Sequence, residues 1–132
     1  MARILIIEDD EPVRTMLGLT LAHFGHTVIE ARDGEEGLML FKHNKTDLVI
    51  TDIVMPEKEG LEVLMTLRKK YPPVKMIAIS GGGRQTAKDN LHIAKLMGAT
   101  RVLAKPVTTE TLMAVVSELL AEGKLDRPKV AV

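Results

Sequence analysis

The chain has 132 residues, a length typical of a single domain with its own hydrophobic core. Its 18 basic residues balance 18 acidic ones, so its overall charge recruits neither nucleic acid nor an anionic membrane. The absence of cysteine excludes disulfides and thiolate metal sites. No apolar run approaches the ~20 residues of a membrane span, and no signal-peptide pattern precedes the first strand, so we expect a soluble, cytoplasmic protein.

Five short apolar segments rich in branched residues are predicted to be strands. They lie at residues 3–7, 27–31, 47–51, 75–80 and 100–104. Most are apolar at nearly every position, which is typical of parallel strands covered on both faces.

Segments with helical spacing lie between these strands. The first begins near Pro12, ends before Gly25, and has a predicted apolar stripe of Val13, Met16, Leu17, Leu21 and Phe24. Asp33 and Glu36 form a variant of the capping box at the start of the second helix.

Three further helices are expected. One begins near Leu61 and ends before Pro72, and one covers residues 84–97 after a run of three glycines. The last has an apolar stripe from Leu112 to Leu119. Alternating strands and helices with right-handed crossovers predict an α/β fold, a doubly wound parallel sheet with helices on both faces.

Ligands of such sheets bind at the carboxyl ends of the strands, so the residues at these ends indicate the chemistry. The first strand is followed by Glu8 and Asp9, the third by Asp52, the fourth ends in Ser80, and the fifth is followed by Lys105. Two carboxylates ~4 Å apart repel each other by about 4 kcal/mol at an effective dielectric constant near 20. The acids therefore require a counter-charge, which a divalent cation and Lys105 can supply.

Oxygen ligands without histidine or cysteine favour Mg²⁺ over zinc. A Mg²⁺ site beside a carboxylate, a hydroxyl and a lysine is suited to phosphoryl transfer. Asp52 would be the nucleophile and would form an acyl phosphate, while the metal and Lys105 would neutralise the phosphoryl oxygens. Asp10, next to the acidic pair, is interpreted as a helix cap or a solvated residue in preference to the alternative of a direct metal contact.

The segments "ILIIEDD", "DLVITDIVMP", "AIS" and "LAKP", in this order and spacing, resemble the receiver domain of bacterial two-component response regulators. The resemblance covers residues 2 to about 121. It implies a flavodoxin-like fold, a five-stranded sheet with strand order 2-1-3-4-5. We expect a receiver domain at residues 1–121, followed by a C-terminal tail at 122–132 without an output domain.

The resemblance also implies roles for individual residues. Asp52 corresponds to the phosphoacceptor, and Glu8 and Asp9 correspond to the acidic pair that binds Mg²⁺. The main-chain carbonyl of Val54 corresponds to a third protein ligand of the metal.

Two further residues match the family pattern. Ser80 corresponds to the hydroxyl that senses the conformation, and Lys105 to the phosphate-binding lysine before an expected cis bond to Pro106. A histidine kinase or phosphotransfer protein would donate the phosphoryl group. A downstream protein would bind the face of the fourth helix, fifth strand and fifth helix, with the chain a monomer or a phosphorylation-promoted dimer. No nucleic acid or membrane is expected to bind this domain.

The chain departs from the family pattern at Val102, where an aromatic residue is common. This departure keeps open an alternative, a receiver-like module that acts without phosphorylation. A phosphohydrolase with an aspartyl intermediate is a weaker alternative, because such enzymes usually have a second acid two residues after the nucleophile, where this chain has Val54. The favoured hypothesis is a signalling phosphoacceptor that catalyses only its own phosphorylation and dephosphorylation.

Overall fold

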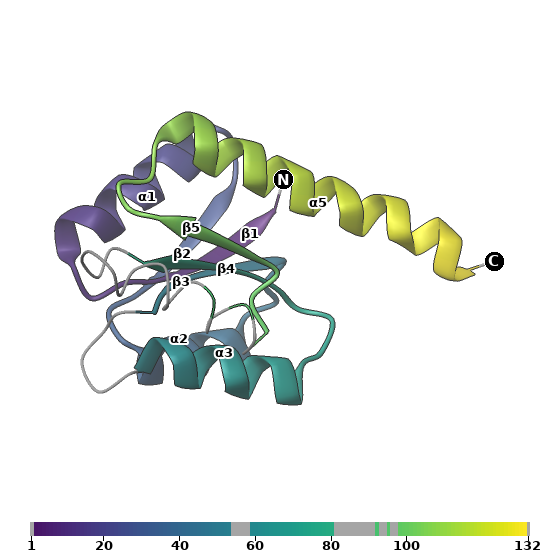
Figure 1. Cartoon of the computed structure of the whole chain (residues 1–132), viewed down its shortest axis with the longest axis horizontal. Coiled ribbons are helices and arrows are strands. Elements are labelled where there is room, and N and C mark those ends of the chain that lie inside the picture. Colours follow the sequence, from purple (N-terminus) through teal and green to yellow (C-terminus); the bar gives the residue numbers. More distant parts are fainter. Residues whose placement is uncertain (1, 54–58, 81–91, 93–94, 96–97, 132) are drawn as a thin grey trace.

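A computed structural model describes residues 2–53, 59–80, 92, 95 and 98–131. Its centre is a five-stranded parallel sheet with the order β2-β1-β3-β4-β5, which confirms the predicted fold class (Figure 1). The strands are β1 (Arg3–Ile7), β2 (Thr27–Ala31), β3 (Leu48–Asp52), β4 (Lys75–Ser80) and β5 (Arg101–Ala104). Every residue of β3 is buried, as expected of the middle strand of a sheet covered on both faces.

Helices cover both faces of the sheet (Figure 1). The helices α1 (Glu11–His23) and α5 (Thr109–Ala131) pack on one face, and α2 (Gly34–His43) and α3 (Glu59–Lys70) pack on the other. Residues 84–97, predicted as a helix, lie almost entirely outside the described part of the chain. No helix among the described residues is long and apolar enough to cross a membrane.

Capping contacts bear out the predicted helix boundaries. The Asp10 side chain accepts a hydrogen bond from the N–H of Val13 at 3.3 Å, and Asp33 accepts one from Glu36 at 2.8 Å. Gly25 follows α1 with φ of 92°, a conformation that favours glycine. The last helix, α5, continues beyond residue 121 into the segment predicted as a tail, and the domain boundaries stay a prediction.

The predicted apolar stripe of α1 is partly wrong. Leu17 and Leu21 are buried, but Met16 and Phe24 are 40% and 48% exposed. Arg14 is buried in their place, on the face of α1 that meets the sheet. Apolar spacing identified Leu17 and Leu21 on this face but missed Arg14, because the Arg14 side chain is charged.

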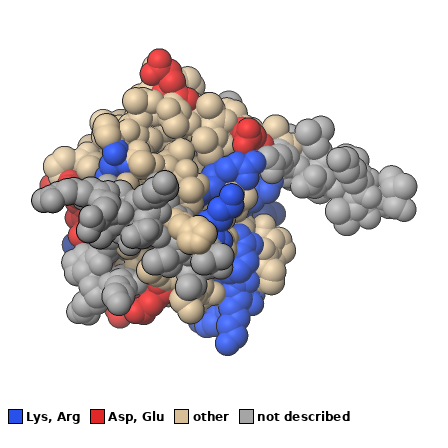
Figure 2. Space-filling view, in the orientation of Figure 1, with Lys and Arg blue, Asp and Glu red and all other residues tan. Residues whose placement is uncertain are grey.

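Basic side chains gather on one side of the face shown in Figure 2. The last turn of α3 is basic, and Arg68 in that turn donates to the main-chain oxygen of Gly98 from Nε at 3.1 Å and from Nη2 at 2.6 Å. Lys75 at the start of β4 donates to the main-chain oxygen of Leu119 at 2.5 Å. These three hydrogen bonds join elements near the amino ends of the strands, at the opposite end of the sheet from the acidic residues.

Candidate functional site

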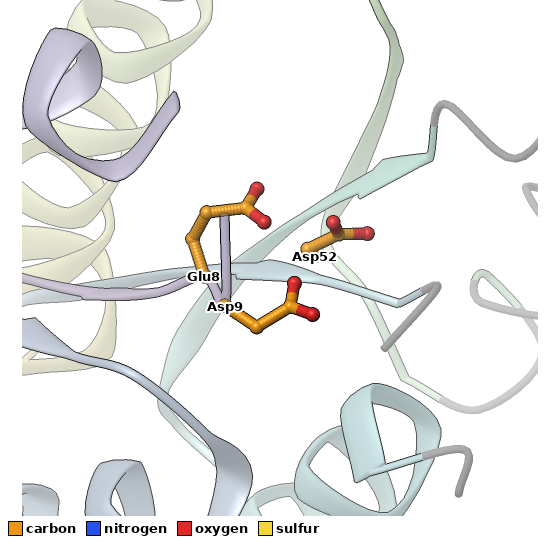
Figure 3. Close-up of side chains that lie close together, drawn as sticks. All are labelled: Glu8, Asp9 and Asp52. Carbon is orange, nitrogen blue, oxygen red and sulfur yellow. The ribbon is translucent and has the colours of Figure 1, made fainter. Parts of the chain in front are cut away.

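Three carboxylates meet at the carboxyl ends of β1 and β3. Figure 3 shows the side chains of Glu8, Asp9 and Asp52 directed toward one another. One carboxylate oxygen from each residue lies within 4.8 Å of the others. Glu8 and Asp52 are only 1% and 3% exposed, whereas Asp9 is exposed.

Main-chain hydrogen bonds hold this edge of the sheet. The Glu8 N–H donates to the main-chain oxygen of Ala31 at 3.1 Å, which continues the pairing of β1 with β2. The Asp10 N–H donates to Glu8 Oε2 at 3.1 Å and so fixes one oxygen of that carboxylate. On the other strand, the Ile53 N–H donates to the main-chain oxygen of Ile79 at 3.0 Å.

Lys105 brings a positive charge to the carboxylates from the end of β5. Its N–H donates to the main-chain oxygen of Ser80 at 2.9 Å, and its peptide bond to Pro106 is cis. Its Nζ lies 2.9 Å from Asp52 Oδ2 and 3.2 Å from Glu8 Oε1. One ammonium group therefore forms ion pairs with two buried carboxylates. Because Asp9 is a third acid, the site keeps an excess of negative charge.

The electrostatics of the site follow from burial. Burial raises the pKa of Glu8 from 4.5 to about 7; the hydrogen bond from Asp10 opposes this rise and the nearby Asp52 adds to it. Burial also acts to lower the pKa of Lys105, but the hydrogen bond and charge of Asp52, with Glu8, outweigh it and leave this pKa raised. Lys105 is therefore charged at neutral pH, while Glu8 is near its midpoint.

Two buried oxygens have no hydrogen-bond partner among the described residues, Glu8 Oε1 and Ser80 Oγ. The contact of Glu8 Oε1 with Lys105 is an ion pair without hydrogen-bond geometry. A buried polar atom without a partner costs free energy unless something binds it. Ser80 is completely buried at the end of β4, next in sequence to the undescribed residues 81–91.

The three carboxylates fit a hard divalent cation. They offer only oxygen ligands, one of them Glu8 Oε1, which accepts no hydrogen bond from a described residue, and the one positive charge of Lys105 does not balance their negative charge. Mg²⁺ prefers such oxygens and keeps several waters, which the exposed side of Asp9 allows. The carbonyl of Val54, expected as a further ligand, lies outside the described residues.

An apolar pocket of about 380 Å³ borders the site on the side of α1. Its lining includes Met16 from α1, Pro106 and Val107 from the segment before α5, and Lys105 itself. The exposure of Met16, which the apolar spacing of α1 did not predict, is thus explained by its place at this pocket.

Arg14 is a residue of this region that the sequence analysis did not single out. Its Nη1 donates to the main-chain oxygen of Glu8 at 2.9 Å in a buried hydrogen bond. Its spacing of three, four and seven residues from Leu17, Gly18 and Leu21 was a signal that it shares their buried face.

We expect the Glu8→Gln variant to remove a pH dependence of stability in metal-free buffer. Because the folded-state pKa of Glu8 is raised, the folded protein binds more protons than the unfolded one between about pH 4.5 and pH 7. The wild-type free energy of unfolding should therefore contain a part that is lost as pH rises through this window. As the pH rises from 5 to 8, the free energy of unfolding of the variant relative to that of the wild type should increase by about 2 to 3 kcal/mol.

Urea unfolding of both proteins at pH 5 and pH 8 with chelator measures this difference directly. Glu11→Gln, at an exposed position of α1, is the matched control and should follow the wild type. Equal pH dependence in the wild type and Glu8→Gln would show that the Glu8 pKa is not raised by folding.

Comparison with known proteins is consistent with this geometry. The chain is 34% identical to the response regulator MprA of Mycobacterium ulcerans over 98% of its own length and 54% of that protein. A response regulator receiver domain of Clostridium thermocellum has a TM-score of 0.86 and 32% identity, covering 95% of this chain and 98% of that one. The response regulator TrrA of Thermotoga maritima, solved in complex with Mg²⁺-BeF, has a TM-score of 0.78 and 32% identity, covering 90% and 99%.

The chain spans about half the length of MprA, so the match to that protein concerns one part of it. Residues 4–117 match the family described as the response regulator receiver domain. This match covers the described acidic cluster, the lysine at the end of β5 and all of the sheet except Arg3, the first residue of β1. The chain belongs to the receiver domain family of two-component response regulators.

Proposed function

We propose that this chain is a phosphorylation switch in which Asp52 accepts a phosphoryl group from the phosphohistidine of a histidine kinase or phosphotransfer protein. The observation that carries the proposal is the position of the Asp52 carboxylate, buried at the carboxyl end of β3 beside two other acids and 2.9 Å from Lys105 Nζ. Family membership supports a protein donor and action in the cytoplasm.

In the proposed reaction, an Asp52 carboxylate oxygen attacks phosphorus and the P–N bond to the donor imidazole breaks. The imidazole nitrogen takes the bonding electron pair and then a proton. Lys105, already between Asp52 and Glu8, pairs with the phosphoryl oxygens. Glu8, Asp9, Asp52 and the main-chain carbonyl of Val54 would hold Mg²⁺, which would supply the remaining positive charge.

Dephosphorylation reverses the state of the switch. Water attacks phosphorus, the bond to the Asp52 oxygen breaks, and inorganic phosphate leaves. We propose a phosphoacceptor with self-catalysed chemistry and not a phosphohydrolase, because the chain has Val54 where such enzymes usually have a second acid and because its family supports a signalling role.

We propose that Ser80 and β5 transmit the phosphorylated state. The Ser80 hydroxyl, without a partner among the described residues, can donate to a phosphoryl oxygen. Its main-chain oxygen accepts from Lys105, so movement of Ser80 reaches the end of β5. Val102 in β5 pairs with Ala78 of β4 and packs partly buried against the core, so any readout must use this smaller side chain in place of an aromatic ring.

The downstream partner is proposed to bind the face of the fourth helix, β5 and α5; residues 84–97, where the fourth helix is expected, lie almost entirely outside the described part of the chain. The partner is either an unlike protein or a second copy of this chain in a phosphorylation-promoted dimer. The chain spans only part of its curated relatives, so the output of the whole protein is part of the proposal.

Incubation with Mg²⁺ and acetyl phosphate, followed by intact mass measurement, tests the proposed function. One added phosphoryl group that is lost in mild alkali supports the switch. Continuous release of inorganic phosphate without a lasting adduct would favour a phosphohydrolase, and no adduct in the presence of bound Mg²⁺ would favour a module that acts without phosphate.

We expect Asp9→Ala to weaken Mg²⁺ binding by about tenfold or more, because it removes a metal ligand. Loss of a group that only hydrogen-bonds to a metal ligand already weakens metal binding by about tenfold. The same change should raise the apo melting temperature, since it relieves repulsion among the three carboxylates. Calorimetric Mg²⁺ titration and thermal melting with chelator measure the two effects.

Asp10→Asn is the matched control, because it removes the same charge from the next residue while asparagine still caps α1. Mg²⁺ affinity should stay near the wild-type value in this variant. If Asp9→Ala bound Mg²⁺ as tightly as Asp10→Asn, the metal would have to bind elsewhere.

A further inference from the structure

Arg14 is a buried charge whose contacts run toward the acidic cluster. Its side chain is 11% exposed, and its Nη1 donates to the main-chain oxygen of Glu8 at 2.9 Å. Burying a guanidinium is costly unless its hydrogen bonds and charge are matched. The burial of Arg14 therefore depends on the groups that accept its hydrogen bonds and balance its charge.

Glu30 of β2 provides the opposite charge. Its Oε1 lies 3.6 Å from Arg14 Nε, and its side chain is 42% exposed. Gly18, one turn after Arg14, leaves room for this side chain, because a Cβ at Gly18 would overlap with Glu30 Oε2. Glu11 also approaches Arg14, at 3.9 Å, but its side chain is 81% exposed and adds little to the pairing.

The oxygen that Arg14 binds belongs to the peptide bond between Glu8 and Asp9. The orientation of this peptide plane fixes where the Asp9 side chain leaves the backbone. The Glu8 carboxylate has its own supports in the Asp10 N–H and Lys105. The Asp9 carboxylate is exposed and accepts no hydrogen bond from a described residue, so its direction depends on the backbone.

We infer that Arg14, held by Glu30, is a positioning residue for Asp9. By fixing the Glu8–Asp9 peptide, it directs the Asp9 carboxylate toward Glu8 and Asp52 and so raises the affinity of the cluster for Mg²⁺. Arg14 itself touches neither the metal nor the phosphoryl group. The inference rests on the proposed function, since it concerns the metal on which phosphorylation depends.

The test compares Mg²⁺ affinity, measured by calorimetry, in four variants. Arg14→Met should weaken Mg²⁺ binding by about tenfold, the lower end of the range seen when hydrogen-bond partners of metal ligands are lost. Arg14→Lys should recover part of the affinity, because an ammonium can donate to the Glu8 carbonyl. Glu30→Gln should weaken binding several-fold, and Arg32→Met, an exposed arginine beside β2, should leave it unchanged.

Phosphorylation rates separate positioning from a general loss of structure. At saturating Mg²⁺, Arg14→Met should be labelled by acetyl phosphate at close to the wild-type rate, and at low Mg²⁺ much more slowly. A purely structural role would lower the melting temperature without changing Mg²⁺ affinity in the folded protein. If Arg14→Met does not fold, Glu30→Gln provides the same comparison with the guanidinium intact.

The outcomes distinguish this inference from the proposed function. Wild-type affinity in both Arg14→Met and Glu30→Gln, with the wild type binding Mg²⁺ and labelled at Asp52, would overturn the inference alone. A wild type that binds Mg²⁺ but is not labelled would overturn the proposed function while leaving the positioning of Asp9 testable by affinity. A wild type that does not bind Mg²⁺ would overturn both.

Discussion

Asp52→Asn is expected to accept no phosphoryl group from acetyl phosphate in the presence of Mg²⁺, while it folds as the wild type does. The amide has almost the same shape as the carboxylate but lacks its negative charge and is a poor nucleophile. Its oxygen can still accept the hydrogen bond that Lys105 Nζ donates to Asp52 Oδ2 at 2.9 Å. The substitution therefore removes the proposed chemistry and leaves the packing at the end of β3 in place.

The same variant should not be less stable than the wild type in metal-free buffer. Asp52 is one of three carboxylates within 4.8 Å of one another, and removal of its charge reduces their repulsion. Loss of the Asp52 charge also removes one of the causes that raise the pKa of Glu8, although burial remains the largest.

Intact mass measurement after incubation with the donor provides the readout. Asp47→Asn is a suitable control, because Asp47 lies beyond the opposite end of β3, where its carboxylate accepts from the Arg3 N–H at 2.8 Å. The control should be labelled like the wild type. Equal labelling of Asp52→Asn and Asp47→Asn would remove Asp52 from the role of phosphoacceptor.

Gly60→Ala is expected to lower the free energy of unfolding by about 2 to 3 kcal/mol, in the upper part of the range for overpacking. A Cβ at this position, in the first turn of α3, would overlap with the main-chain oxygen of Asp52 and the Cα of Ile53. Both atoms belong to backbone that is paired with β4, with Asp52 opposite Ile79. No side chain can rotate away, so α3 or the end of β3 must move.

Movement of the end of β3 would also displace Asp52 from Lys105 and the other acids. We therefore expect slower labelling of Gly60→Ala by acetyl phosphate even when the variant is fully folded. Urea unfolding in metal-free buffer measures the stability, and the initial rate of the mass shift measures the labelling.

Gly37→Ala in α2 is the matched comparison. A Cβ at Gly37 would overlap with Cδ1 and Cγ1 of the buried Ile7 side chain, whose torsion angles can adjust at a smaller cost than a shift of paired backbone. Gly37→Ala should therefore lose less stability and label more nearly at the wild-type rate. Equal losses in the two variants would show that the backbone of β3 yields as easily as a side chain.

Local sequence patterns were sufficient to predict the five strands, the helices α1, α2, α3 and α5, and their order along the chain. Nearly uniform apolar segments predicted parallel strands, and Asp10, Asp33 and Gly25 predicted helix ends that the structure confirms. These signals are local, because a cap or a strand pattern depends on residues only a few positions apart. Because ligands bind at the carboxyl ends of parallel strands, the residues at these ends could be predicted as the functional site.

The contacts between these end residues depend on tertiary packing. Lys105 contacts a carboxylate 53 positions earlier in the chain, and its pairing with both Glu8 and Asp52 depends on the packing of β5 beside β4. No short-range pattern contains that information. The raised pKa of Glu8 has the same origin, since its largest cause is burial by elements distant in sequence.

The face that α1 presents to the sheet was likewise decided by the fold. Apolar spacing predicted that Met16 would be buried, but Met16 borders an open pocket and Arg14 is buried instead. Arg14 is retained there because the carbonyl of Glu8, just after β1, accepts a hydrogen bond from it and the carboxylate of Glu30 in β2 pairs with its charge. Helical spacing places Arg14 on the face of Leu17 and Leu21, but its burial depends on partners that only the folded chain brings within reach.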